Sequence, residues 1–199
     1  MKYLALICVA LIICSFKPRS RFKKFPKDFD NVDSLIRFVT PGKNYTYWAF
    51  CQGPASEFNS IVVFSNGTKP DSIKFKSART GLFGGCEPIV CFNYIEYIDN
   101  GKVGYITTPA EFKEFLGSID NLQEAVLLAK SQYYLDIDDK NRKGGSFILE
   151  NGIYKLRLVR YHLCPDTKES IEVTIDRSDG NSKTLSRGTY YKSKQCTVI

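Results

Sequence analysis

The only histidine in the chain, His162, stands two residues before Cys164, and this pair is the first candidate for chemistry. Both lie in a run of β-branched and aromatic residues that predicts a strand, and residues two apart on a strand point to the same side. A thiolate beside an imidazole is the arrangement of a nucleophilic cysteine. However, no glycine-flanked cysteine or serine of the kind found at nucleophile turns accompanies the pair. We therefore expect Cys164 to form a disulfide and His162 to be a surface residue, and we predict no catalytic residue.

Cysteines are numerous enough to predict a disulfide-containing protein. Seven are present, at positions 8, 14, 51, 86, 91, 164 and 196. In an oxidising compartment most of them pair. We expect a bond between Cys164 and Cys196, which would tie the end of the chain to a sheet, and a bond from Cys51 to Cys86 or Cys91. A bond between Cys86 and Cys91 is the alternative, because a proline turn separates them.

Two groups of residues partly resemble metal sites, but neither is predicted to bind a metal. A zinc site would combine Cys86 and Cys91 with His162 and Cys164, but their spacing is not that of paired, closely spaced ligands. The segment DIDDKNRKGGSF, starting at Asp136, matches a calcium loop in its first two ligand positions. It has Lys, Asn and Phe where a third ligand, a glycine and a closing glutamate are needed. We interpret it as a solvated loop of mixed charge, and we predict no metal and no cofactor.

The amino terminus has the pattern of an export signal. MKYLALICVALIICSF contains one lysine and then an apolar run from Tyr3 to Cys14, which is shorter than the ~20 residues of a membrane span. We predict a signal peptide over residues 1–15. Cleavage after Cys14 or Ser15 would give a soluble exported protein. Lipidation of Cys14 is the alternative, because LIIC resembles a bacterial lipobox, although Ile13 stands where that motif has a small residue.

A basic segment follows the apolar run. KPRSRFKKFPK, residues 17–27, carries no acidic residue and six cations, which are Lys17, Arg19, Arg21, Lys23, Lys24 and Lys27. Like charges this close repel one another, so we predict a flexible basic tail over residues 16–29. Two roles remain open for it. One is a solvated spacer, and the other is peripheral contact with an anionic membrane, to which each cation would contribute about 1 kcal/mol.

The rest of the chain is formally neutral. The net charge of +7 comes from the first 27 residues, since residues 28–199 hold 21 basic and 21 acidic groups. Nucleic-acid binding depends on several cations on one face of a domain. We therefore expect no nucleic-acid partner.

Strands are expected between residues 45 and 107, after a short helix. DFDNVDSLIRFV, residues 28–39, predicts a helix capped by Asp30 or Asn31. The strand-like runs that follow are YTYWAFC, SIVVF, DSIKFK and VCFNYIEYI. Asn66-Gly67 and Asn100-Gly101 have the composition of hairpin turns between such runs.

Two helices are predicted in the middle of the chain. Thr108 is a good cap, Pro109 suits the first helical position, and Glu111 completes a capping box. A second box, of Asp120 with Gln123, is expected to open the helix NLQEAVLLAKSQ. The apolar face of this helix is wide, so we predict that it is buried.

Strands return after residue 146 and determine the fold class. FILE, IYKLRLVRYHL and SIEVTID are separated by turns at Asn151-Gly152 and at residues 178–181, and the alternation slips near Val159, where we predict a β-bulge. We predict an α+β protein with antiparallel sheet hairpins and a central buried helix packed on one face. The globular region is expected over residues 30–199, with candidate sub-lobes at 30–107 and 108–199.

Aromatic residues are frequent in the expected strands and need an interpretation. They are Tyr45, Tyr47, Trp48, Phe50, Phe92, Tyr94 and Tyr97. Core packing and cross-strand pairs are favoured for them over a sugar-binding or peptide-binding surface.

These observations favour an exported protein over a cytosolic one. We expect a non-enzymatic binding or structural protein of the cell envelope, the periplasm or the extracellular space, acting on an unknown protein or small ligand. The alternative is a secreted hydrolase, because the 21 acidic residues offer many carboxylate pairs. Nothing in their spacing selects one pair.

Overall fold

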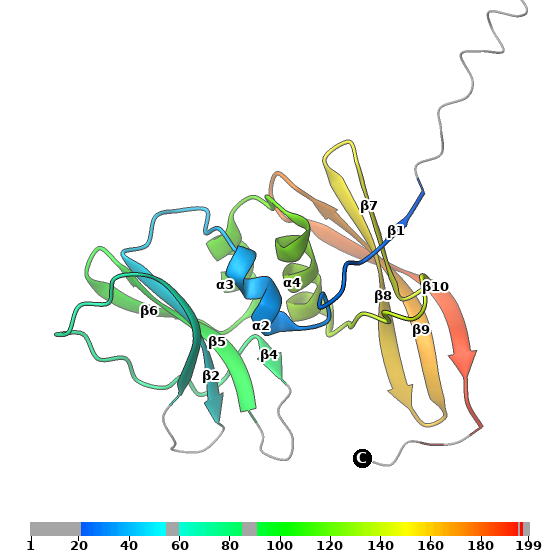
Figure 1. Cartoon of the computed structure of the whole chain (residues 1–199), viewed down its shortest axis with the longest axis horizontal. Coiled ribbons are helices and arrows are strands. Elements are labelled where there is room, and N and C mark those ends of the chain that lie inside the picture. Colours follow the sequence, from blue (N-terminus) through cyan, green and yellow to red (C-terminus); the bar gives the residue numbers. More distant parts are fainter. Residues whose placement is uncertain (1–20, 55–59, 85–90, 195, 197–199) are drawn as a thin grey trace, which may run out of the picture.

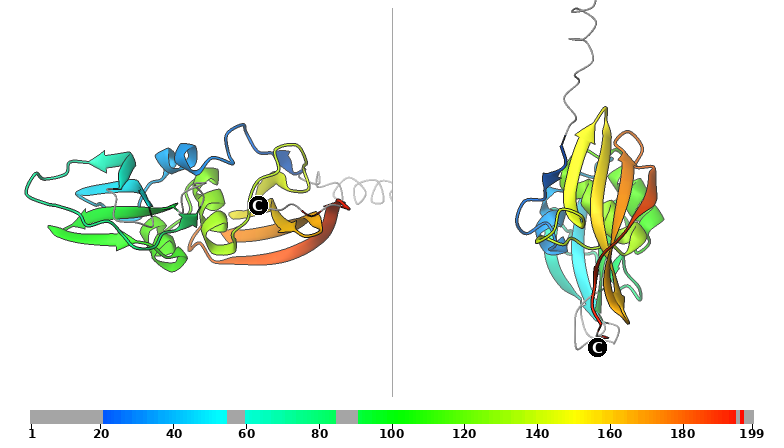
Figure 2. Two further views of the ribbon diagram at one scale, coloured as in Figure 1. Left: turned by 90° about the horizontal axis from the view of Figure 1, so that it is seen from below. Right: turned by 90° about the vertical axis from the view of Figure 1, so that its right-hand side faces the viewer.

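The protein consists of two antiparallel sheets with short helices between them. The computed structural model describes residues 21–54, 60–84, 91–194 and 196. Along the long axis one sheet lies at each end of the molecule and the helices lie between them (Figures 1 and 2). The coarse prediction of an α+β protein with antiparallel sheets and a disulfide is confirmed, whereas the helices are short and none is clearly a single central helix packed on one face.

Sheet A is a meander that also takes in a strand from the start of the described chain. Its order is β1-β7-β8-β9-β10, and its strands are β1 (Lys23–Lys24), β7 (Gly145–Glu150), β8 (Ile153–Leu163), β9 (Asp166–Asp176) and β10 (Ser182–Lys192). All four pairings are antiparallel. The turn between β7 and β8 has Asn151 and Gly152 at φ 51° and 77°, as the sequence predicted, because this tight hairpin turn requires positive φ at both positions.

Sheet B is built around β5, which has neighbours on both sides. Its strands are β2 (Tyr47–Pro54), β3 (Ile61–Gly67), β4 (Phe83–Gly84), β5 (Cys91–Asp99) and β6 (Lys102–Ile106). The order is β3-β2-β5-β4, and β6 also pairs with β5. The Asn100-Gly101 turn between β5 and β6 is confirmed.

One predicted strand of this region is wrong. DSIKFK, residues 71–76, forms no strand, and Asn66-Gly67 lies at the end of β3 instead of in a hairpin turn. Ile73 and Phe75 pack against a small cluster that includes Tyr47 and Tyr94. An extended segment lying across a sheet face needs the same apolar alternation as a strand, so the pattern could not distinguish the two.

The helices are short and begin where capping residues place them. They are α2 (Val32–Leu35), the 3₁₀ helix η1 (Ile36–Phe38), α3 (Pro109–Leu116) and α4 (Leu122–Tyr133). Asn31 caps α2, and Thr108 with Glu111 forms the predicted box at α3. The predicted box at α4 is one residue out of register, because Asn121 and Glu124 form it.

A single large core joins the two sheets through the helices. It contains Trp48 and Phe50 of β2, Phe112 and Phe115 of α3, and Leu156 of β8, all buried. The helix α4 buries most of its residues in this core. Apolar burial is the main stabilising contribution to folding, so both sheets depend on the same set of contacts.

The β-bulge predicted near Val159 is wrong. Strands β8 and β9 pair without a register shift from residue 153 to 163. Leu158 and Val159 are both fully buried, and Val159 exchanges two main-chain hydrogen bonds with Asp136. Asp136 thereby extends the sheet at the edge of β8, and the side chain of Val159 is covered by the same loop at Gly144, so an apolar residue is buried on each face of β8 here.

Candidate anionic-surface binding site

The basic segment predicted as a flexible tail is in part an edge strand. Lys23 and Lys24 of β1 pair with Phe147 and Ser146 of β7. The ring of Phe25 stacks on Phe29 and Phe147, with centroid distances of 5.7 Å and 5.3 Å. Aromatic burial and main-chain pairing therefore fix this segment from Lys23 onward, which corrects the tail prediction for residues 23–29.

The loop between α4 and β7 lies beside this segment and is held by hydrogen bonds from strands β9 and β10. Asp138 is only 5% exposed, and its carboxylate accepts hydrogen bonds from Tyr190 and Lys168. Burial alone would raise the pKa of Asp138, but these donors hold it below its ordinary value. A side chain at Gly145 would collide with the carbonyl oxygen of Asp138, so this loop conformation requires glycine at position 145.

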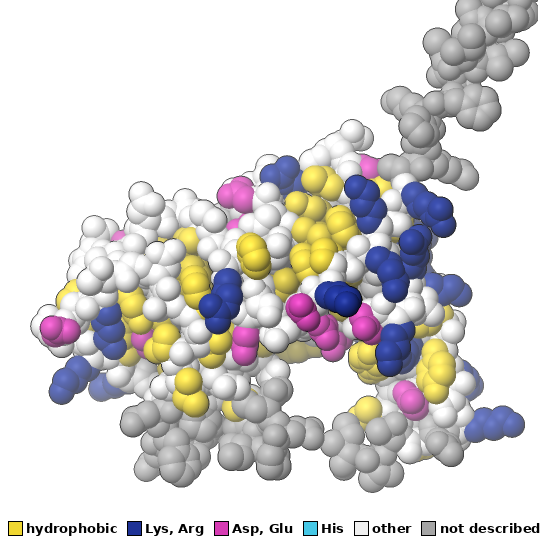
Figure 3. Space-filling view, viewed as in Figure 1, with side chains coloured by type: hydrophobic (Ala, Val, Ile, Leu, Met, Phe, Trp, Pro, Cys, Tyr) yellow, Lys and Arg dark blue, Asp and Glu magenta, His cyan; other side chains and the backbone are white. Residues whose placement is uncertain are grey.

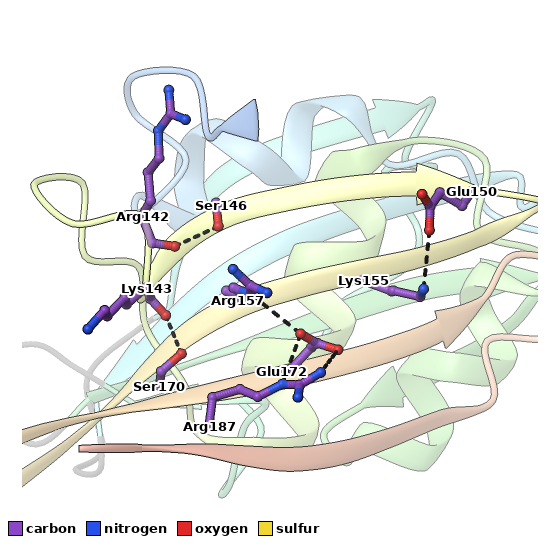
Figure 4. Close-up of polar contacts among 9 residues, drawn as sticks. All are labelled: Arg142, Lys143, Ser146, Glu150, Lys155, Arg157, Ser170, Glu172 and Arg187. Atoms are coloured by element: carbon purple, nitrogen blue, oxygen red, sulfur yellow. Dashed lines mark hydrogen bonds and ion pairs between the residues drawn. The ribbon is translucent and has the colours of Figure 1, made fainter. Parts of the chain in front are cut away.

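Two serines of sheet A fix the other end of the loop. The Ser146 hydroxyl donates to the carbonyl oxygen of Arg142 across 2.6 Å, and the Ser170 hydroxyl donates to that of Lys143. Figure 4 shows both contacts. Because the main chain is held, the side chains of Arg142 and Lys143 are presented outward, where both are exposed.

Together these two segments form a surface that we call the basic patch. Its members are all exposed and are Arg21, Lys23, Lys24, Lys27, Lys140, Arg142 and Lys143. Lys and Arg side chains gather over β1, β7 and this loop in Figure 3. Two acidic residues within the same segments, Asp28 and Asp139, are also exposed. The patch therefore has a clear excess of positive charge.

The outer face of sheet A continues the positive charge beyond the patch. Glu172 accepts hydrogen bonds from Arg187 at 2.8 Å and 3.1 Å and from Arg157 at 3.4 Å (Figure 4). Burial opposes ionisation of Glu172, but the two guanidinium groups hold its pKa below the ordinary value. The guanidinium of Arg157 also lies 3.8 Å from the ring centroid of Phe22. One carboxylate thus serves two arginines, which leaves one positive charge in excess.

Of the predicted disulfides, one pair is confirmed, and the predicted bond from Cys51 is wrong. Cys164 and Cys196 form a disulfide. Cys51 is a buried free thiol in the small cluster on the outer face of sheet B, where burial and the neighbouring Glu96 raise its thiol pKa to about 12. Cys91 is disulfide-bonded. Cys86 lies outside the described residues.

His162 and Cys164 do not form a thiol–imidazole pair, and aromatic residues of the strands lie in the core. Cys164 is oxidised, and His162 Nε2 lies 3.3 Å from a carboxylate oxygen of Glu169 at the surface. Trp48, Phe50 and Tyr94 are buried, as the core interpretation predicted. Within residues 21–54, 60–84, 91–194 and 196, no group of three or more His, Cys, Asp or Glu side chains is placed to hold a metal ion.

Sequence reasoning missed the contribution of Lys140, Arg142 and Lys143. They lie in the loop interpreted as solvated and mixed in charge. Nothing local in the sequence identifies them, because their role depends on β1 pairing with β7 more than 120 residues away. The lipidation candidate Cys14 and the cations Lys17 and Arg19 lie outside the described residues.

The described helices include none that is long and apolar enough to cross a membrane. Comparison with protein-family models, curated proteins and solved structures finds no match.

Proposed function

We propose that this chain is an exported, non-enzymatic binding protein that contacts an anionic lipid surface of the cell envelope through the basic patch. The observation that carries the proposal is the pairing of β1 with β7, which brings the amino-terminal cations beside those of the loop after α4. Cations from two distant parts of the sequence then act on one surface.

The magnitude of the attraction supports a lipid surface as the partner. A Lys or Arg near an anionic bilayer contributes on the order of 1 kcal/mol, and the contribution falls off within about 10 Å. The seven cations of the patch belong to two adjacent, hydrogen-bonded segments. Lys17 and Arg19 precede them in the sequence and would add to the same attraction.

The proposal also connects with processing of the amino terminus. A single lipid chain gives only marginal membrane binding, and a basic patch is one of the second signals that make it stable. If Cys14 is lipidated, the patch would follow the anchor after a few residues. If the signal is cleaved after Cys14 or Ser15, the patch alone would give reversible contact. The intact mass of the natively produced mature protein separates these two outcomes.

Sedimentation with lipid vesicles tests the proposal. The soluble chain from Lys17 onward should bind vesicles of phosphatidylcholine mixed with phosphatidylserine and should not bind pure phosphatidylcholine. The triple variant Lys140→Ala, Arg142→Ala, Lys143→Ala should weaken binding about 100-fold, because it removes three contributions of about 1 kcal/mol.

A matched variant distinguishes the effect of the basic patch from the effect of the protein's total charge. Lys74→Ala, Lys76→Ala, Arg79→Ala also removes three exposed cations, from the segment that covers sheet B. It should leave vesicle binding nearly unchanged. Equal losses in the two triple variants would contradict a localised site, and no binding to either kind of vesicle would contradict the proposed partner.

A further inference from the structure

A cleft of about 600 Å³ lies between the two sheets, and its lining comes from both sheets and from the chain around α2 and the end of α4. Its lining includes Phe83 of β4 with the preceding Leu82, Tyr161 of β8, and Tyr134 directly after α4. Figure 3 shows the molecule hollowed between its two halves. Ligand sites occur preferentially at such junctions and have volumes of roughly 300–1,000 Å³.

The charge of this cleft is opposite to that of the basic patch. Its titratable lining includes the carboxylates of Asp30, Asp33 and Asp136 and one cation, Lys130. The Lys130 ammonium is already engaged by Asp136 at 2.5 Å and by the main-chain oxygen of Asp30 at 3.1 Å. Within the described part of the chain, Asp30 and Asp33 have no ion-pair partner. The cleft therefore favours a positively charged occupant.

Two tyrosine rings at the cleft suit the same occupant. Tyr134 is 82% exposed and has a left-handed backbone, with φ 53° and ψ 43°, directly after α4. Glycine or asparagine is the usual residue at this helix-end position, so a large exposed ring there has no evident packing purpose. Tyr161 is 47% exposed and already has the Lys168 ammonium 5.4 Å from its ring centroid. Aromatic faces attract ammonium and guanidinium groups.

We propose that the cleft binds a cationic peptide segment of another protein, with a Lys or Arg side chain between the ring of Tyr134 and the carboxylate of Asp33. The apolar wall of Leu82, Phe83 and Leu135 would contact the aliphatic part of that side chain. This site goes beyond the lipid contact, because it has the opposite charge and lies on different elements.

Fluorescence anisotropy with a labelled peptide of alternating arginine and glycine tests the site. The full mature chain should bind this peptide and should not bind the corresponding peptide of glutamate and glycine. Asp33→Asn should weaken binding about two- to five-fold, as expected for loss of one exposed charge pair. Asp71→Asn, which removes an exposed carboxylate outside the cleft, is the matched control and should have no effect.

A substitution at Tyr134 tests the ring without risk to the fold. Tyr134→Gly removes the ring and also relieves the positive φ, so the thermal midpoint should stay the same or rise. Peptide affinity should fall about two- to five-fold, the size of an exposed cation–π contact. Tyr134→Phe keeps the ring face and should retain binding.

Three results would overturn the proposal. They are no binding of the arginine peptide, equal binding of the glutamate peptide, and equal affinities in Asp33→Asn, Tyr134→Gly and the unmodified chain. Displacement of the peptide by a neutral oligosaccharide such as cellohexaose would assign the cleft to sugars instead. Vesicle binding should be unchanged in both cleft variants, so failure here is distinguishable from failure of the lipid contact.

Discussion

The ammonium group of Lys24 donates a hydrogen bond of 2.9 Å to the main-chain oxygen of Asp139, a residue 115 positions later in the chain. This contact joins the amino-terminal segment to the loop after α4. It places a main-chain acceptor, and not a carboxylate, beneath the lysine, so the positive charge of Lys24 is held in position without being neutralised. The basic patch depends on contacts of this kind.

Phe25→Ala should weaken vesicle binding without changing the charge of the protein. The variant removes the ring that stacks on Phe29 and Phe147, so β1 should detach from β7 and separate the two groups of cations. We expect affinity for anionic vesicles to fall about five-fold, equivalent to about 1 kcal/mol. Trypsin should also cut after Lys23 and Lys24 more rapidly, because a detached strand is accessible.

Phe38→Ala is the control for that experiment. Phe38 is 57% exposed on η1, so its truncation removes an aromatic ring without affecting β1. Unchanged vesicle binding together with unchanged trypsin cleavage in Phe25→Ala would show that the segment does not depend on this stack.

Glu172→Gln should destabilise the protein at neutral pH and have less effect in acid. Glu172 is 8% exposed and is the only carboxylate hydrogen-bonded to both Arg157 and Arg187 in the described chain. Losing it should reduce the free energy of unfolding by about 1–3 kcal/mol, measured by urea denaturation. Glu150→Gln, which breaks the more exposed pair with Lys155, should cost less than about 1 kcal/mol.

The sign of the pH dependence follows from the lowered pKa of Glu172. A depressed folded-state pKa means that the ionised carboxylate contributes stability fully above its unfolded pKa of about 4.3. That contribution is lost as the pH falls through the lower folded-state value. The difference in stability between the unmodified chain and Glu172→Gln should therefore shrink as the pH falls below about 4. A difference that stays constant into this range would contradict the assigned pairing.

Replacing either cysteine of the disulfide should reduce the stability of the protein as much as replacing both. Cys164 and Cys196 are separated by 32 positions, and a loop of that size contributes about 3–4 kcal/mol in the chain-entropy description. Cys164→Ser, Cys196→Ser and the double variant should lose equal amounts of stability in urea denaturation, since all three remove one bond. Additive losses would show that the cysteines contribute independently.

Cys51 should be unreactive in the folded protein. Its thiol is buried, and its pKa of about 12 leaves almost no thiolate near neutral pH. Iodoacetamide should modify the Cys51 peptide only after denaturation, as followed by mass spectrometry. Rapid modification under native conditions would contradict the buried position, and Cys51→Ala should leave vesicle binding unchanged.

Local signals in the sequence located the helix ends well. Thr108 and Glu111 lie three residues apart and their mutual hydrogen bonds form without any tertiary contact, so the start of α3 was predicted correctly. At α4 the same logic was one residue out, because Asp120 and Asn121 are both good caps and only the folded structure selects Asn121. Hairpin turns could also be predicted from the sequence where Asn-Gly joins two paired strands.

Features that depend on distant segments could not be predicted. The sequence around Val159 shows two consecutive apolar residues but does not show that the loop after α4 will pair with the edge of β8 at Asp136 and cover Val159 at Gly144. The sequence favours a disulfide for Cys51, because the chain contains several other cysteines. In the structure Cys51 lies on the face of β2 that packs under Phe75 and is a free thiol. The basic patch was missed in part for the same reason, since its second group of cations is recruited by strand pairing.

The shared core has a consequence for how this molecule can be divided. Trp48 of one sheet and Leu156 of the other belong to the same buried cluster, so a chain cut between residues 107 and 108 would leave each fragment with an uncovered apolar face. Heating should release both sheets in one transition instead of two. We therefore expect that neither half would be stable if it were expressed alone.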